Sequence, residues 1–269
     1  MKSVIRPLLG ASLSFIAATS LAANMPPAPD APQGDEFDVI HGVRVADPYR
    51  WLENWDDPKV QAWSDAQNDR TRIYLDALAG RDAIKAELMR LITATSPAFY
   101  ELQVRGAHMF ALYFDPKFQQ PMLVVLNSAA DPDSSTTVLD PNKQDASGHT
   151  AIDWYAASPD GTRVAVSLSL NGSEDGTLHV YEVATGKEID APIPRVQYPT
   201  AGGSLAWTAD SKAFWYTRYP GDDAPEADRH FFQQVYFHAI GGNASANPMV
   251  LGTKDGVPRT GEIFLENAS

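Results

Sequence analysis

The sequence predicts a mainly β fold: an incomplete β-propeller of about three to four blades, preceded by two N-terminal α-helices. Three observations support this fold class. Apolar residues follow helical spacing between residues 57 and 93, short strand-like runs replace them from Tyr100 onward, and a strand-turn-strand unit recurs after 50 residues. The 269 residues, 44% hydrophobic and 20% charged, are typical of a globular chain with one large core or two modest ones.

The N-terminus is predicted to be a cleaved export signal. Residues 1–22 combine a basic start, an apolar stretch from Leu8 to Leu21 and small residues around a cleavage site at Ala22. An uncleaved membrane anchor is the alternative, but Ser and Thr interrupt the stretch, which is short for a span of roughly 20 residues. Residues 23–35, rich in Pro and Gly, are predicted to form a flexible leader. We therefore expect an exported protein, periplasmic or secreted, with no membrane attachment after cleavage.

Residues 36–97 are predicted to form a helical segment. The first helix is predicted to begin at Pro58, because Asp57 can cap the free backbone N–H groups of a helix start. Proline has no backbone N–H, but the first residue of a helix does not need one. Its helical spacing runs up to Gly80, and a second helix spans about Asp82 to Thr93. Both helices are amphipathic, so each is expected to bury one face.

Residues 98–269 are predicted to form the incomplete propeller. Strand-like runs such as His108–Phe114 and Met122–Leu126 are separated by turns that contain Asp, Pro or Gly. A weak internal repeat, in which Ile152–Val166 resembles Gly203–Tyr216, places an Asp-centred turn between two apolar strands in each copy. The two turns lie 50 residues apart, which suits one four-stranded blade of roughly 40 to 50 residues.

The last segment, Gly261–Ser269, resembles the first strand of another blade and ends where its turn is expected. A closed propeller commonly needs more blades than this chain supplies, and an open one exposes sheet edges. We therefore expect the sequence to be a truncated product, a fragment or a partial record of a longer protein.

Several segments occur in an order that is typical of one enzyme family. They are Asp47–Asn68, which contains Asp47-Pro48-Tyr49-Arg50-Trp51-Leu52-Glu53, then Leu139–Asn142, Ser158–Gly161, Ala206–Thr208 with Tyr216 and Tyr219-Pro220, and Gln233–His238. Each piece alone is weak, but their order and spacing across residues 36–250 are specific. In these segments the chain resembles the prolyl oligopeptidases. The first run fits a dipeptidyl peptidase relative less well.

The resemblance implies a serine peptidase that cleaves short peptides after proline. In this family an α/β-hydrolase domain carries Ser, Asp and His, and a seven-bladed propeller admits only short peptides. The N-terminal helical segment and the C-terminal half of such chains build the catalytic domain, and only the first contribution is recognisable here. The implied partners are short proline-containing peptides and the missing C-terminal hydrolase domain, with no cofactor. Because the Ser-Asp-His triad is missing, we expect the chain by itself to be inactive.

The resemblance also implies one substrate-binding residue. Arg195-Val196-Gln197-Tyr198 matches a family motif in which an aromatic residue of a propeller loop lines the peptide pocket, with Tyr198 in place of the usual Phe. Residues 199–203 make a longer link to the next strand than is usual. Pocket lining by Tyr198 and ordinary packing within the loop both remain open.

The residues themselves indicate no catalytic, metal or cofactor site. Only residues 202–206 approach the G-x-S-x-G pattern of a serine nucleophile, but Ala206 replaces the last Gly, and a strand and turn rather than a helix follow Ser204. The six His residues show no H-E-x-x-H pair, acidic clusters such as Asp222-Asp223 lack the ligand spacing of a calcium loop, and no phosphate-binding glycine loop occurs. The absence of Cys excludes disulfides, and the net charge of −13 disfavours nucleic acid as a partner.

A second function class stays open. A non-catalytic, propeller-like module could bind peptides or a partner protein without hydrolysing them. Such a module is expected to be a compact monomer that unfolds cooperatively, because it must protect its sheet edges. A fragment is expected to associate through unpaired strands.

Overall fold

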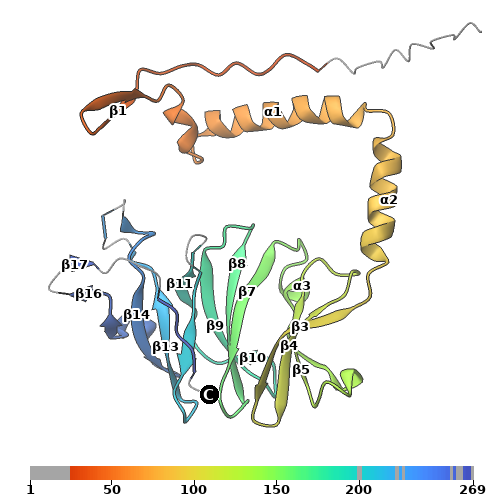
Figure 1. Ribbon diagram of the computed structural model, residues 1–269, viewed down its shortest axis with the longest axis vertical. Helices are drawn as coiled ribbons and strands as arrows, with labels where there is room; N and C mark the ends of the chain where they lie inside the picture. The colour runs from red at the N-terminus through yellow and green to blue at the C-terminus, as the bar shows by residue number, and fades with distance from the viewer. Residues whose placement is uncertain are drawn as a thin grey trace, which may run out of the picture. The chain divides into compact units, whose positions relative to one another are not determined.

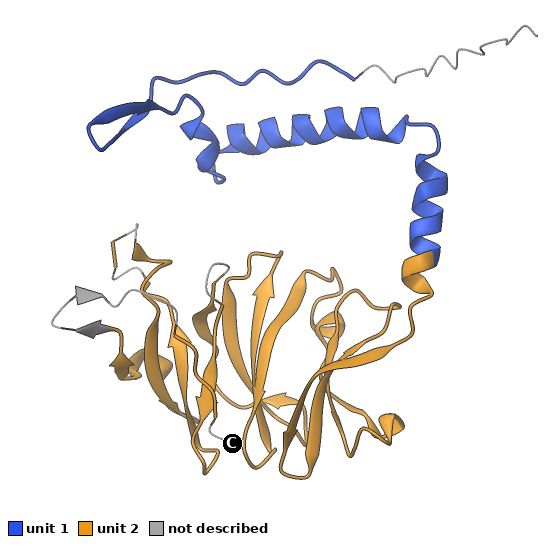
Figure 2. Cartoon of the chain, in the orientation of Figure 1, with its two compact units in different colours: residues 1–90 blue, residues 91–269 orange. Residues whose placement is uncertain are grey.

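The computed structural model describes residues 25–198, 202–221, 224–225, 228–254, 257–258 and 263–267. The predicted export signal, residues 1–22, lies outside the described residues. The chain forms two compact units, residues 1–90 and 91–269, which Figure 2 shows in different colours. The division between the two units falls inside a helix. The domain boundary predicted from the sequence lies between residues 97 and 98, and it stays a prediction.

The described part of unit 1 begins with residues 25–36, which form no helix or strand, followed by a small hairpin. The hairpin consists of β1 (Phe37–Ile40) and β2 (Val43–Ala46). The two residues that join the strands, His41 and Gly42, both have positive φ, at 50° and 81°. Positive φ at both positions is the backbone of the tight turns whose twist matches that of two antiparallel strands.

The predicted first helix is confirmed. After a short 3-10 helix, η1 (Arg50–Glu53), helix α1 (Pro58–Asp76) starts at the expected proline. The side chain of Asp57 accepts a hydrogen bond from Lys59 N at 2.9 Å, which satisfies one of the N–H groups that a helix start leaves free. Trp51 and Trp63 contact each other edge to face, with ring centroids 6.1 Å apart, and therefore join η1 to α1.

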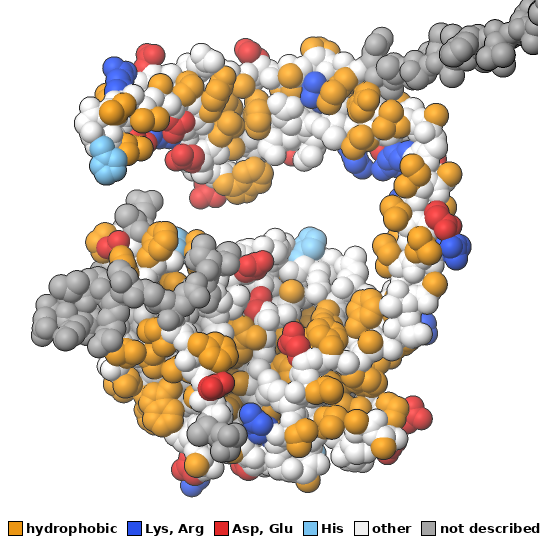
Figure 3. All heavy atoms as spheres, viewed as in Figure 1, with side chains coloured by type: hydrophobic (Ala, Val, Ile, Leu, Met, Phe, Trp, Pro, Cys, Tyr) orange, Lys and Arg blue, Asp and Glu red, His pale blue; other side chains and the backbone are white. Residues whose placement is uncertain are grey.

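The predicted second helix is confirmed as α2 (Arg81–Thr93). None of its residues is buried within this chain, and Val60 is the one buried residue of α1. Figure 3 shows hydrophobic side chains exposed along both helices. The large ones in the two helices are Ile73, Ile84, Leu88, Met89, Leu91 and Ile92. In the described part of the chain, no helix combines the length and apolar character needed to cross a membrane.

Unit 2 contains three antiparallel sheets of four or five strands, which follow one another along the sequence and which we call blades 1 to 3 (Figure 1). Blade 1 consists of β3 (Ala98–Arg105), β4 (His108–Phe114), β5 (Met122–Leu126) and β6 (Thr136–Leu139). Blade 2 consists of β7 (Thr150–Ala157), β8 (Arg163–Leu170), β9 (Gly176–Glu182), β10 (Lys187–Glu188) and β11 (Ile193–Gln197). Blade 3 consists of β12 (Leu205–Trp207), β13 (Ala213–Arg218), β14 (Gln234–Ala239) and β15 (Met249–Leu251).

The blade architecture confirms the predicted mainly β fold. In blade 2, β10 and β11 both pair with β9, so together they form one interrupted outer strand. The remaining elements are short. They are η2 (Pro132–Ser134), α3 (Pro141–Gln144), η4 (Ala244–Ala246), β16 (Thr253–Lys254) and β17 (Val257–Pro258).

The predicted internal repeat corresponds to the β7–β8 hairpin of blade 2 and the β12–β13 hairpin of blade 3. The turn of blade 2 has Gly161 at φ 71°, and the same position in blade 3 holds Ser211 at φ 59°. Ser211 compensates for this unusual backbone because its hydroxyl accepts a hydrogen bond from Asp160 N at 3.2 Å. Its carbonyl also accepts a bond from Arg163 Nη1 at 2.6 Å, so the two turns are tied together.

The turns of blades 1 and 2 pack closely against each other at two glycines, where a side chain would not fit. A Cβ atom on Gly161 would lie 2.7 Å from the carbonyl oxygen of Arg105, and one on Gly106 would lie 2.7 Å from that of Asp160. Both glycines have positive φ, at 71° and 57°. We call the end of the blades with these turns the turn end, and the opposite end the loop end.

The core of unit 2 lies between neighbouring blades. One cluster packs blade 1 against blade 2 and includes Phe110, Leu123, Val164 and Tyr181. A second cluster packs blade 2 against blade 3. It includes Ile193, Val196, Trp207, Phe214 and Tyr216. Each sheet is therefore covered mainly by its neighbour.

The connection from blade 1 to blade 2 is organised by one carboxylate. The side chain of Asp145 accepts hydrogen bonds from the N–H and hydroxyl groups of Ser147 and Thr150 and from the N–H of His149. These bonds, with Ser147 contributing most, lower the pKa of Asp145 from 3.8 to about 2.

The strand predicted over residues 261–269 does not form within the described residues 263–267. A strand needs a partner that supplies a ladder of backbone hydrogen bonds. Here the segment is held by side chains next to β12 instead: Leu265 N donates to Ser204 Oγ at 2.9 Å, and Asn267 Nδ2 donates to the carbonyl of Trp207 at 2.7 Å.

Candidate functional site

The predicted substrate-binding residue, Tyr198, lies at the loop end of unit 2, directly after β11. A bulge shapes this strand, because its register with β9 shifts between Pro194 and Gln197. Arg195, inside the bulge, has φ 65°, and its carbonyl accepts a hydrogen bond from Tyr219 N at 3.0 Å. Bulges turn side chains away from the regular alternation of a strand. The bulge thus joins the outer strand of blade 2 to the end of β13 in blade 3.

Tyr198 belongs to an aromatic cluster built from three loop segments. Its ring stacks on the imidazole of His230, with centroids 4.3 Å apart and an interplanar angle of 14°. The ring of Tyr219 lies 5.4 Å away on a tilted plane, at 54°. Gly202 N donates to the carbonyl of Tyr198 at 2.8 Å, which holds the start of the following loop. Tyr198 is therefore fixed by contacts on its backbone and its ring.

A cavity of about 230 Å³ lies beside this aromatic cluster. The residues that line it are Asp175, Arg195, Gln197, Tyr198, Tyr219, Pro220, Gly221, Arg229 and His230. Aromatic faces next to a few polar groups are typical of sites that hold small organic groups. Two guanidinium groups and one carboxylate line the cavity beside the aromatic rings, so its wall is polar on one side and apolar on the other.

A half-buried carboxylate, Asp153, lies close to the strand that carries Tyr198. Its two oxygens accept hydrogen bonds from Ser169 Oγ at 2.6 Å and Ser167 Oγ at 2.8 Å. Burial raises the pKa of Asp153 against the effect of these two bonds, and the carboxylates of Glu174 and Asp175 raise it further. Both acceptor atoms are occupied, so the geometry favours a packing role for Asp153.

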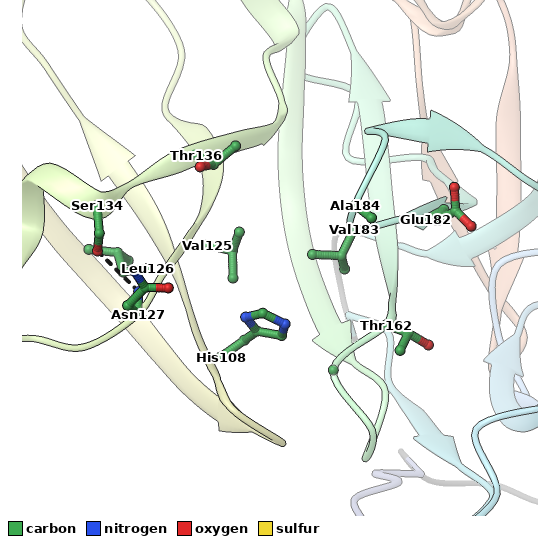
Figure 4. A pocket seen from close by; sticks show the side chains of 11 residues that line it. His108, Val125, Leu126, Asn127, Ser134, Thr136, Thr162, Glu182, Val183 and Ala184 are labelled. Atoms are coloured by element: carbon green, nitrogen blue, oxygen red, sulfur yellow. Dashed lines mark hydrogen bonds between the residues drawn. The ribbon is translucent and has the colours of Figure 1, made fainter.

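A separate cavity of about 430 Å³ lies at the turn end, between blades 1 and 2 (Figure 4). The side chains of Val125 and Val183 face each other across it from the two blades, with the imidazole of His108 between the walls. Ser134 Oγ, on the blade 1 side, accepts a hydrogen bond from Asn127 N at 3.1 Å. None of the residues around Tyr198 lines this cavity, and its nearest polar groups form no pattern that indicates a reaction.

The near match to a serine nucleophile is an ordinary blade residue in this structure. Ser204 directly precedes β12 and is 5% exposed. Its Oγ accepts from Leu265 N at 2.9 Å and donates to the carbonyl of Ile263 at 3.4 Å. No hydrogen bond joins a serine hydroxyl to an imidazole among the residues that the structure describes. A nucleophile needs such a base within reach, and Ser204 has none among the described residues.

Two of the histidines contact carboxylates, one between blades 2 and 3 and one within blade 2. His238 in β14 is fully buried, and its Nε2 lies 2.9 Å from Asp190 Oδ2, which also accepts from Gly241 N. His179 in β9 makes a matching contact of 2.7 Å with Glu188, but at a more exposed position. Within the described ranges, no group of three or more His, Asp or Glu side chains is arranged to hold a metal ion.

Comparison with known proteins places this architecture in a family. The family model described as "Prolyl oligopeptidase, N-terminal beta-propeller domain" matches residues 29–261. The chain belongs to the prolyl oligopeptidase family. The resemblance seen in the sequence motifs is thereby confirmed, and the matched region includes the two helices as well as the blades.

Relatives within the prolyl oligopeptidase family match most of this chain. The prolyl endopeptidase of Elizabethkingia meningoseptica is 27% identical over 252 residues, which cover 90% of this chain and 33% of that protein. Prolyl oligopeptidase A of Galerina marginata is 28% identical over 256 residues, which cover 84% of this chain and 34% of that protein. The chain thus spans about a third of the length of the curated relatives it matches.

Solved structures agree with this assignment. A chain from a study of two prolyl endopeptidases matches with a TM-score of 0.73 and 29% identity, over 84% of this chain and 32% of that one. Prolyl oligopeptidase B from Galerina marginata, bound to a 25mer macrocyclization substrate, matches with a TM-score of 0.64 and 22% identity, over 82% of this chain and 33% of that one. The second match supports the fold alone.

The neighbours of Tyr198 could not be read from the sequence. Tyr219 was part of a family motif but had no predicted role, and Arg229 and His230 had none at all. They lie in the long connection between β13 and β14, which has no periodic pattern. One signal could have found Tyr219: it directly follows β13, the strand of blade 3 that corresponds to β8 in blade 2.

Proposed function

We propose that this chain is the N-terminal helical and propeller part of an exported prolyl oligopeptidase that cleaves short peptides after proline. The observation that supports the proposal most is the family match over residues 29–261, together with an aromatic cavity at Tyr198. In this proposal Tyr198 lines the peptide-binding pocket, and its stack with His230 presets the ring before a peptide arrives. A preset ring lowers the ordering cost of binding.

The chain by itself has no peptidase activity in this proposal, because the catalytic Ser, Asp and His belong to a hydrolase domain outside these 269 residues. The first test is the DNA beyond the codon for Ser269. We expect further blades, then a Gly-x-Ser-x-Gly motif with later Asp and His. A stop codon at that point would contradict the proposal and favour a binding module. Turnover of a chromogenic proline peptide by the purified chain, blocked by a serine-directed inhibitor, would contradict the inactivity of the chain.

The role of Tyr198 is tested in the product of the complete reading frame. Tyr198→Ala is expected to lower kcat/KM for a chromogenic proline peptide about 5- to 50-fold, as expected when one apolar pocket wall is lost. Tyr198→Phe should keep most of the activity, because it retains the ring. Trp215→Ala is the matched control, since Trp215 is a partly exposed aromatic residue of blade 3 that is absent from the lining of the Tyr198 cavity. Equal losses in Tyr198→Ala and Trp215→Ala would show that Tyr198 has no special role.

Export is a separate part of the proposal, supported by the sequence of residues 1–22. We expect the protein in the periplasm or the medium, with a new N-terminus at Ala23. N-terminal sequencing of the protein recovered from these fractions checks this. Recovery of the full sequence from Met1 in the cytoplasm would contradict export.

A further inference from the structure

The Pro-rich leader is bound along α1. In its described part, residues 25–35, the carbonyl oxygen of Pro26 accepts a hydrogen bond from Arg70 Nε at 2.8 Å, and that of Pro32 accepts one from Trp51 Nε1 at 2.9 Å. Figure 1 shows this segment running beside α1. The two bonds hold both ends of the proline-rich stretch, so the leader is an internal ligand of η1 and α1.

The sequence of the leader restricts it to an extended conformation. Six of the seven residues from Pro26 to Pro32 are prolines or directly precede a proline. Proline fixes φ at about −65°, and a residue before proline is pushed towards the β and polyproline II regions. The stretch forms no helix or strand in the structure. A polyproline II segment has no internal hydrogen bonds, so its carbonyl groups are free to accept bonds from a partner surface.

The exposure of the leader follows the three-residue period of polyproline II. Pro26 and Pro29 are half-buried, whereas Pro27 and Ala28 between them are exposed. One edge of the leader is therefore covered and the other faces solvent. This is the pattern of a bound polyproline II segment, and it differs from that of a tail that touches a surface at one point.

The surface under the leader is suited to such a segment. Trp51 and Trp63 contact each other with ring centroids 6.1 Å apart, and Arg70 follows Trp63 by seven residues, on the same face of α1. Tryptophan rings pack on proline rings while an N–H group reaches a carbonyl, as in aromatic-lined sites for proline-rich peptides. Among the described residues, no acceptor bonds the buried Nε1 of Trp63. We call the surface formed by Trp51, Trp63 and Arg70 the leader face.

We propose that the leader face is a binding site for proline-rich peptides in the polyproline II conformation, and that the leader is an exchangeable ligand that occupies it. Because the leader is part of the same chain, it competes with a free peptide at an effective concentration of about millimolar order. The inference goes beyond the proposed function, since the leader face belongs to unit 1 and the cavity at Tyr198 belongs to unit 2.

The test measures binding of a dye-labelled peptide with the sequence of residues 24–36 to the purified chain. The unmodified chain is compared with a leader variant that combines Pro26→Ala, Pro29→Ala and Pro32→Ala and leaves the leader face unchanged. We expect the leader variant to bind the peptide about tenfold more tightly, because its own leader competes less well. A peptide with Pro26→Ala should bind more weakly than one with Pro27→Ala, since each lacks one proline but only Pro26 is half-buried.

Two substitutions in α1 locate the bound peptide. In the leader variant, Arg70→Gln should weaken binding about tenfold, because it removes the charged N–H group that holds a carbonyl. Arg72→Gln is the matched control, since Arg72 is exposed on the same helix and contacts Asp76, and it should leave binding unchanged. Equal binding by the unmodified chain and the leader variant would overturn the proposal, as would tight binding that survives Arg70→Gln.

The same measurements separate this inference from the proposed function, because the labelled peptide also contains the prolines expected of a substrate. Binding that needs Arg70 but not Tyr198 supports the leader face as a peptide site. Binding that Tyr198→Ala weakens and Arg70→Gln does not supports the proposed function and overturns this inference. A leader variant that binds no peptide also overturns it. If the unmodified chain is then a dimer and the leader variant a monomer, the leader occupies a second copy of the chain instead.

Discussion

The fit between the turns of blades 1 and 2 predicts a specific cost for one added methyl group. Gly161 and Gly172 have almost the same backbone, with φ 71° and 68°. A Cβ on Gly161 would lie 2.7 Å from the carbonyl oxygen of Arg105 and 3.1 Å from Cδ2 of His108, whereas a Cβ on Gly172 would meet nothing within 4 Å. Replacing either glycine by alanine therefore carries the same backbone cost, roughly 1–2 kcal/mol in this left-handed region. The change in the unfolded chain is also the same.

The difference between the two variants isolates the fit of the turns. Forcing a methyl group against backbone that cannot move aside costs about 1–3 kcal/mol. Gly161→Ala should therefore unfold at a urea midpoint roughly 0.5–1 M below that of Gly172→Ala. The assay follows the β signal in circular dichroism, because tryptophans lie in both units. Equal midpoints for the two variants would refute the idea that the turns hold neighbouring blades together.

Two further predictions concern charged groups. The pKa of Asp145 is about 2, below its ordinary 3.8, so its hydrogen bonds stabilise the fold above about pH 4, and this stabilisation is lost as the pH falls towards 2. The urea midpoint of the unmodified chain should therefore fall more between pH 7 and pH 2 than that of Asp145→Asn. Parallel curves for the two proteins would contradict this. Asp190→Ala should lower the free energy of unfolding by about 1–3 kcal/mol, because it leaves Nε2 of the buried His238 without a partner, while Nδ1 keeps its contact with Asn247. Glu188→Ala, which breaks the more exposed contact to His179, should cost about 0–1 kcal/mol. Similar losses in these two variants would show that burial does not set the difference.

Local signals in the sequence predicted most of the fold. Asp57 and Pro58 determine the start of α1 through groups that are two residues apart or less, so no knowledge of the rest of the chain was needed. The runs His108–Phe114 and Met122–Leu126 match β4 and β5 at both ends, because strong apolar runs are bounded by turn residues. The spacing of the two Asp-centred turns predicted the repeat of blades for the same reason.

The site depended on contacts that leave no such signal. The stack between Tyr198 and His230 joins residues from different connections, and stacking imposes no spacing in sequence. The bulge at Arg195 was also missed, since a single residue with φ 65° is set by the packing of β11 against blade 3. The segment 263–267 shows the opposite error: its apolar pattern predicted a strand, but a pattern alone does not supply a pairing partner.

The contacts between turns and between core clusters connect each blade to the next one along the chain. Within the described part of unit 2, blade 2 therefore has two neighbours, and blades 1 and 3 share few contacts with each other. A domain built this way behaves like a row of coupled repeats, whose stability is a sum of single-repeat and nearest-neighbour contributions. The loss of one interface between blades then destabilises only the two blades that form it. In this chain, blade 2 is therefore expected to be the most stable of the three sheets, and blades 1 and 3 are expected to unfold locally while blade 2 remains folded.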